Sequence, residues 1–267
     1  MAEPIFEVRN LKQHFQVNSK FTVKALDGIS FTIEDGEIFA LVGESGSGKS
    51  TAAKTIMGVY PPTDGEIFFH GRDITDGKGR RENKDLLHKK LSIIFQDSAA
   101  ALNQRMTVEK IIGEPLQIHH VYKDKKALNE RIDELLQLVG LNETYRKKYP
   151  SEMSGGQRQR VAIVRSISMQ PEHRFSFLLI AHDLSIVRFI SDRVGVLYHG
   201  KLVELGKTKQ IFETPCHPYT KSLLSAVPKP DPLGERNKKL VEFDAASFTG
   251  EGELQEVAPG HFILTSP

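Results

Sequence analysis

The stretch Gly43-Glu44-Ser45-Gly46-Ser47-Gly48-Lys49-Ser50 decides how this chain folds. It matches the pattern G-x-x-x-x-G-K-[ST], which is the phosphate-binding P-loop or Walker A motif. Its glycines let successive backbone N–H groups turn inward to form a nest for an anion. Lys49 is expected to reach the β- and γ-phosphates of a nucleotide, and the Ser50 hydroxyl to help hold Mg²⁺.

The residues on either side of the loop provide the context that this motif needs. Residues 37–42 are mostly apolar and predict a strand, whereas residues 51–57 predict a helix that ends at Gly58. A strand, a glycine loop and a helix in this order place bound phosphates at a helix N-terminus. The alternative is a Gly/Ser-rich turn that binds nothing, and the flanking segments favour the phosphate site.

Composition limits the class of protein. The chain has 267 residues, enough for one large α/β domain or two modest ones. With 39% hydrophobic and 26% charged residues it is typical of a soluble protein, and a net charge of +2 gives no support for nucleic-acid binding. The single cysteine, Cys216, cannot form an internal disulfide and suits a reducing cytosol. We expect it to bind no metal, because partner ligands are lacking.

The chain shows no sign of crossing or entering a membrane by itself. No apolar run approaches the roughly 20 residues that span a bilayer. The N-terminus lacks the basic and apolar regions of a signal peptide. If the protein works at a membrane, we therefore expect it to do so from one side of the bilayer and through a partner protein.

Other segments predict further elements around the loop. Strands expected at residues 5–11 and 24–33 suggest a small antiparallel sheet beside the nucleotide, where Phe15 either stacks on an adenine or packs in the core. A buried-type strand at 91–95 precedes Gln96, which either caps the strand or contacts a metal or water.

Residues 107–140 have the apolar spacing of helices. Pro115 is expected to break the first of them, and Gly140 to stop the second. These helices form an insert in the α/β chain, which either packs against the rest of the protein, offers a docking surface to a partner, or does both. Prolines between 215 and 232 predict a linker-like stretch, and the segment from about 227 to 267 is expected to be an ordered appendage or a docking tail.

A second small-residue turn, Met153-Ser154-Gly155-Gly156-Gln157, feeds another helix, which makes it a second candidate anion site. Taken together, this turn and the Walker A loop make the chain resemble the ATP-binding subunits of ABC transporters. The resemblance rests on four motifs. They are a Walker A loop at Gly43 to Ser50, a Q-loop at Phe95-Gln96-Asp97, a signature at Met153 to Gln157 and an H-loop at Ala181-His182-Asp183.

The chain is more closely similar to the oligopeptide/dipeptide importer branch of that family. This likeness rests on Gly156-Gln157-Arg158-Gln159-Arg160, on His217-Pro218-Tyr219-Thr220 and on Leu223-Leu224-Ser225-Ala226-Val227-Pro228. The tail Val257-Ala258-Pro259-Gly260-His261-Phe262 is similar to that of the second of the two ATPases in such permeases.

The resemblance implies an α/β fold of the P-loop NTPase class. It comprises an ABC ATPase core, built as a parallel sheet with flanking helices, together with an antiparallel β subdomain and a helical subdomain. The nucleotide-binding domain is expected at 1–227, with the helical subdomain at about 98–165. A C-terminal extension typical of oligopeptide importers follows at 228–267.

The resemblance also implies the site residues. ATP would lie on the P-loop of one subunit and under the signature turn of a partner, with Phe15 on the adenine. Ser50 and Gln96 would hold Mg²⁺, His182 would contact the γ-phosphate, and a water would attack in line. Gln96 and His182 are thus the catalytic candidates. The cofactor-binding candidates are Phe15, Gly43, Ser45, Gly46, Ser47, Gly48, Lys49, Ser50, Thr51, Ser154, Gly155, Gly156 and Gln157.

The implied function is ATP hydrolysis that powers oligopeptide import. The implied partners are a sister ATPase in a heterodimer, two transmembrane permease subunits and, indirectly, an extracytoplasmic peptide-binding protein, with no nucleic acid. The implied location is peripheral, on the cytoplasmic face of the cell membrane. A soluble ABC ATPase of repair or translation would instead show tandem cassettes or a long coiled coil, and the sequence has neither.

One departure from the family pattern bears on hydrolysis. The family places four apolar residues and Asp-Glu, the Walker B motif, shortly after the signature helix. Here only 25 positions separate Gln157 from His182, and Glu172 runs directly into His173. One βα unit of roughly 30 residues is missing. The family's Mg²⁺-holding Asp and catalytic Glu have no counterpart.

Two explanations compete. Either this sequence omits a segment at 172/173, or the deletion is real and the chain is a hydrolysis-deficient structural or regulatory subunit. Removing a central strand from a parallel sheet would open a slot in the core and leave backbone groups unpaired. That loss would exceed the whole stability of a typical domain, about 5–15 kcal/mol. Physics therefore favours an omitted segment.

Overall fold

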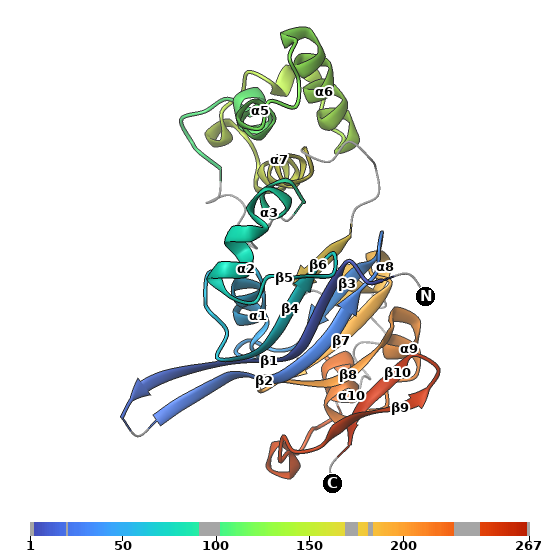
Figure 1. The fold of residues 1–267 in the computed structure, drawn as a ribbon. Coiled ribbons are helices and arrows are strands. Elements are labelled where there is room, and N and C mark those ends of the chain that lie inside the picture. The colour runs from blue at the N-terminus through green and yellow to red at the C-terminus, as the bar shows by residue number, and fades with distance from the viewer. Residues whose placement is uncertain are drawn as a thin grey trace, which may run out of the picture. The chain divides into compact units, whose positions relative to one another are not determined.

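The computed structural model describes residues 3–19, 21–90, 102–168, 176–180, 184–226 and 241–265. The chain divides into two compact units (Figure 1). The first combines Met1–Asn83 with Arg174–Pro267, and the second is Lys84–His173. The P-loop belongs to the first unit and the signature turn to the second. Within the described ranges, every helix is too short or too polar to span a bilayer.

The first unit contains the small antiparallel sheet that the sequence predicts. Its strand order is β2-β1-β4-β5. The long hairpin of β1 and β2 buries alternate apolar residues, because side chains of a strand point to opposite faces in turn. The strands are β1 Phe6–Asn18, β2 Phe21–Ile33, β4 Asp64–Phe69 and β5 Arg72–Asp73.

A second sheet carries the P-loop. Its order is β6-β3-β7-β8-β10-β9, in which β3 is parallel to β6 and β7 and the other pairs are antiparallel. Phe31 of β2 stacks on Phe39 of β3, with ring centroids 4.8 Å apart, and so joins the two sheets. The strands are β3 Ile38–Val42, β6 Phe177–Ile180, β7 Arg193–Tyr198, β8 Lys201–Lys207, β9 Glu253–Ala258 and β10 His261–Thr265.

The helices of the first unit are short and lie close to these strands (Figure 1). They bury apolar side chains such as Val187, Ile211 and Tyr219 in one core with Val194 and Val196 of β7. The helices are α1 Lys49–Ile56, α2 Gly77–Glu82, α8 Leu184–Ile190, α9 Thr208–Glu213 and α10 Pro218–Ser225, with a single 3-10 turn at Ala245–Ser247.

Among the described residues, the strands around the P-loop pair without a gap, and the strand expected at 91–95 lies outside these residues. Strand β3 pairs with β6 on one side and with β7 on the other. Among the described residues β6 is the edge strand on the β3 side of the sheet, and all four of its apolar residues are only half-buried. Four of the five residues of β3 are buried, as is usual for a parallel strand covered on both faces.

The second unit is helical, and the expected subdomain at 98–165 lies within it. Leu128, Ile132 and Leu135 form a buried stripe on α6, which Gly140 ends at a φ of 66°. The predicted break at Pro115 is wrong, because α5 continues past it to Ile118. Proline removes one helical N–H bond, and burial of the neighbouring Leu116 compensates. The helices are α3 Lys84–Lys90, α5 Val108–Ile118, α6 Lys125–Leu138 and α7 Gly155–Ile167, with 3-10 turns at Glu143–Tyr145 and Pro150–Glu152.

The C-terminal segment is part of the main sheet. The β9–β10 hairpin pairs with β8, as an ordered appendage does (Figure 1). The stretch expected to be a linker contains α10, because Pro218 occupies the first helical position, where a missing N–H costs nothing.

A buried carboxylate fixes this region. Glu204 on β8 accepts hydrogen bonds from Cys216 N–H at 2.8 Å, from His217 N–H at 3.0 Å and from His261 Nε2 at 2.7 Å. The expectation that Cys216 has no ligand-type neighbours is wrong, because its thiol, Glu204 and His261 have ligand atoms within 4.8 Å of one another. Three donors already use the carboxylate, so the cluster joins β8, β10 and the start of α10.

We predict that Glu204→Ala lowers the free energy of unfolding by about 2–4 kcal/mol, because two backbone N–H groups and His261 lose their acceptor in a buried site. Chemical denaturation measures this change. The control Glu253→Ala, at an exposed position on β9, should change stability by less than about 0.5 kcal/mol. A loss below about 1 kcal/mol for Glu204→Ala would contradict the assigned role.

Candidate functional site: the phosphate-binding loop

The P-loop lies at the carboxyl end of β3 and leads directly into α1. Gly48 is the N-cap of this helix, with a φ of 109°. Ligands of open α/β sheets bind outside the carboxyl ends of parallel strands, and helix N-termini attract anions. The predicted order of strand, loop and helix is confirmed, including the end of the helix before Gly58.

Two glycines in the loop have no room for a side chain. A Cβ on Gly43 would collide with the carbonyl oxygen of Leu197, and one on Gly48 with that of Ala25. Both residues also have a positive φ, which L-amino acids with a side chain rarely adopt. Strand β2 and the end of β7 therefore close against the back of the loop. A Cβ on Gly46 would meet open space.

Lys49 lies over the loop and is held by it. Its Nζ donates to the carbonyl oxygens of Gly43 at 2.7 Å and Glu44 at 2.6 Å, and lies 3.1 Å from Ser47 Oγ. Burial lowers the pKa of Lys49 because the site disfavours a charge, and the nearby Glu44 carboxylate partly opposes this. A phosphate group beside the ammonium would favour its charged form.

The loop also presents donors that are not in use. No hydrogen bond joins the N–H of Ser45, Gly46 or Gly48 to another residue within the described part of the chain. Ser45, Gly46 and Ser50 are exposed, and Thr51 follows in the first turn of α1. Unused N–H groups, a glycine backbone and a lysine fit the oxygens of a phosphate chain.

Two contacts hold the loop from outside. The N–H of Gly200, in the turn between β7 and β8, donates to Ser47 O at 2.9 Å. The N–H of Glu44 donates to the Tyr219 hydroxyl oxygen at 3.1 Å. Sequence reasoning used Tyr219 only as a family marker and missed this contact, because no local pattern indicates that α10 lies against the loop.

Phe15 is half-buried near the end of the P-loop helix. Its ring meets Tyr60 edge to face, with centroids 5.2 Å apart. It is therefore not a fully buried core residue, and an adenine partner for its ring stays a prediction.

The signature turn has the predicted form of a small-residue turn that begins a helix. Ser154 is the N-cap of α7 and exchanges hydrogen bonds with Gln157 in a capping box. Gln157 Nε2 also donates to the Tyr145 hydroxyl at 2.9 Å. Ser154, Gly155 and Gly156 are exposed, so the turn offers its backbone at the surface of the second unit. Gln96 and His182 lie outside the described residues.

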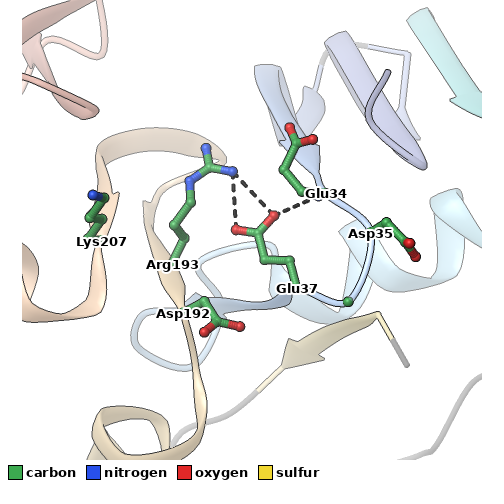
Figure 2. A pocket seen from close by; sticks show the side chains of 7 residues that line it. Glu34, Asp35, Glu37, Asp192, Arg193 and Lys207 are labelled. Atoms are coloured by element: carbon green, nitrogen blue, oxygen red, sulfur yellow. Dashed lines mark hydrogen bonds and ion pairs between the residues drawn. The ribbon is translucent and has the colours of Figure 1, made fainter. Parts of the chain in front are cut away.

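A separate pocket of about 480 Å³ is lined by residues just before β3, at the end of this strand opposite the P-loop. Figure 2 shows the side chains that line it. Within it the Glu37 carboxylate pairs with Arg193 at 3.2 Å and accepts the N–H of Glu34 at 2.7 Å. Asp35 and Asp192 add further negative charge. An acidic lining at the amino end of a strand is unsuited to phosphates, so the candidate site remains the P-loop.

Family comparisons agree with this geometry. The ABC transporter family matches residues 26–175, and the C-terminal region of the oligopeptide/dipeptide transporter family matches residues 203–246. The chain belongs to the ABC transporter family, in the oligopeptide/dipeptide branch.

Individual relatives align along nearly the whole chain. The oligopeptide transport ATP-binding protein OppF of Bacillus subtilis (strain 168) is 45% identical over 99% of this chain and 97% of its own length. The dipeptide transport ATP-binding protein DppF of Lactococcus lactis subsp. cremoris is 39% identical over 100% of this chain and 96% of its own length.

Solved structures share the fold. A dimeric bacterial ABC transporter cassette superposes with a TM-score of 0.66 at 23% identity, over 76% of this chain and 98% of its own. The protein cbiO1 of Clostridium perfringens, part of the ABC transporter complex cbiONQ, gives a TM-score of 0.67 at 25% identity, over 80% of this chain and 93% of its own.

The relatives are longer than this chain. The alignment with the B. subtilis protein has 299 positions, whereas the chain has 267 residues, so at least about 32 positions of that relative have no counterpart here. This shortfall has the size of the βα unit of roughly 30 residues that the motif spacing indicates.

We predict that Gly48→Ala lowers the free energy of unfolding by about 1–3 kcal/mol, because the new Cβ meets the backbone at Ala25 and the positive φ is strained. Thermal and chemical unfolding measure this loss. The control Gly77→Ala adds a Cβ in open space in the first turn of α2 and should be neutral or slightly stabilising. Equal stability of the two variants would contradict the tight packing behind the loop.

Proposed function

We propose that this chain is the ATP-binding subunit of an oligopeptide transporter and that, when a segment with the Walker B carboxylates completes it, it hydrolyses ATP to power import. The observation that carries the proposal is the P-loop itself, with unused N–H donors around Lys49 at the carboxyl end of a parallel strand. Relatives named as oligopeptide transport ATP-binding proteins support the choice of transported substrate.

The loop residues would hold the phosphates of ATP. Lys49 would leave its carbonyl acceptors for the β- and γ-phosphates, and Ser50 with Gln96 would hold Mg²⁺. Phe15 would stack on the adenine, and His182 would contact the γ-phosphate. The exposed turn that begins with Ser154 would cover the ATP of a partner subunit, because its free helix N-terminus suits an anion.

The proposed assembly follows from the branch of the family. A sister ATPase would form a heterodimer with two sandwiched nucleotides, and closure of this dimer would shift two transmembrane permease subunits between conformations. An extracytoplasmic protein would deliver the peptide. The chain would then lie peripherally on the cytoplasmic face of the membrane. The nucleotide-binding domain is proposed at 1–227 and the importer-specific extension at 228–267.

Turnover depends on a segment that this sequence lacks. The Asp-Glu pair of the family holds Mg²⁺ and activates the attacking water, and no apolar strand ending in such a pair precedes His182. A segment inserted between Glu172 and His173 would extend the sheet where β6 is now only half-buried. Binding and hydrolysis of ATP can therefore be tested separately.

We predict that insertion of the corresponding segment of the B. subtilis OppF relative between Glu172 and His173 raises Mg²⁺-dependent ATP hydrolysis by about a hundredfold or more, because it supplies the missing carboxylates. Release of inorganic phosphate measures the rate. The original chain should still bind a fluorescent ATP analogue, and Lys49→Ala should abolish binding and turnover in both forms.

A folded insertion variant that binds ATP without hydrolysing it would overturn the catalytic proposal and favour the hydrolysis-deficient alternative. Failure of the original chain to bind ATP would overturn the nucleotide site.

A further inference from the structure

A hydrogen bond connects the region that matches the oligopeptide/dipeptide transporter C-terminal family, residues 203–246, to the P-loop. The N–H of Glu44 donates to the hydroxyl oxygen of Tyr219 at 3.1 Å. The carbonyl of the same residue, Glu44, accepts from Lys49 Nζ at 2.6 Å and from Ser47 N–H at 3.2 Å. Tyr219 thus fixes the residue whose carbonyl holds the phosphate-binding lysine.

The Tyr219 side chain is rigidly held. It is 2% exposed, and its ring packs on Tyr198 with centroids 4.2 Å apart and on Phe243 at 5.5 Å. Burial raises the pKa of Tyr219 to about 12, so the phenol stays neutral in the physiological range. A buried and neutral hydroxyl, packed against two aromatic rings, is thus placed as an acceptor for the loop.

The position of Tyr219 depends in turn on the C-terminal region. Its own N–H donates to His217 Nδ1 at 3.1 Å, which caps α10. The N–H of His217 donates to Glu204, and Glu204 also accepts from His261 on β10. A continuous set of hydrogen bonds therefore runs from the final hairpin, through β8 and α10, to the P-loop.

We propose that Tyr219 is a positioning residue for nucleotide binding, through which the C-terminal region keeps the P-loop in its phosphate-binding shape. The inference rests on the proposed function, in that it requires the loop to bind ATP. Because the Tyr219 hydroxyl accepts the Glu44 N–H, it acts on the loop through the Glu44 peptide. The ordering of the loop is then complete before the nucleotide arrives, and the affinity is higher.

The alternative is that the bond only adds stability to the fold. The two roles differ in what they change. A structural bond alters unfolding and leaves the affinity of the folded chain for ATP unchanged. A positioning bond alters that affinity, because a less ordered loop must be fixed again when the phosphates bind.

The test compares Tyr219→Phe with the matched control Tyr198→Phe. Both remove one hydroxyl from the same aromatic pair and keep the ring. Affinity is measured by titration with a fluorescent ATP analogue and competition by ATP, and stability by unfolding without nucleotide. Loss of one hydrogen bond of about 1 kcal/mol predicts about fivefold weaker ATP binding for Tyr219→Phe. The control should change affinity by less than about twofold.

The outcomes separate the two levels of the proposal. If the unaltered chain binds no ATP, the proposed function fails. If the unaltered chain and Tyr219→Phe bind ATP equally well, only the positioning role fails, whatever happens to stability. If Tyr219→Phe does not fold, amide hydrogen exchange of the Glu44 N–H in the unaltered chain tests the positioning role instead. Slow exchange without nucleotide is expected, and exchange as fast as that of Gly46 would overturn the inference.

Discussion

The structure depends on one constraint in the P-loop. Its backbone leaves the N–H groups of Ser45, Gly46 and Gly48 without an acceptor among the described residues, while carbonyls of the loop are occupied. Glycine at 43 and 48 permits the required conformation and the close approach of β2 and β7. Lys49 and the N–H of Gly200 occupy the carbonyls. The parallel strands, the helix that follows and the β7–β8 turn are arranged around this loop.

Motifs with a fixed local geometry were predictable from the sequence. The P-loop, the antiparallel sheet and the helix that begins after Ser154 follow from residue types at short spacing. The errors arose where distant contacts outweigh local preference. Pro115 remains inside a helix because the residues around it are buried, and Pro218 begins a helix that the sequence presented as a linker.

The contacts that support the site were not predictable for the same reason. Glu204, Cys216 and His261 lie far apart in the sequence, and only the sheet register brings them together. Tyr219 lies 175 positions from the loop residue that it holds. A single sequence shows which side chains are present, but it does not show which of them come into contact in the fold. The short spacing between Gln157 and His182, in contrast, was visible at once, and the greater length of the relatives agrees with it.

The most direct test of the central claim is calorimetric titration of the purified, folded chain with Mg²⁺ and ATP. We predict saturable binding of about one nucleotide per chain, since one P-loop supplies the phosphate donors. A folded chain that shows no saturable binding would contradict it, because the loop would then have the shape of a phosphate site without its function.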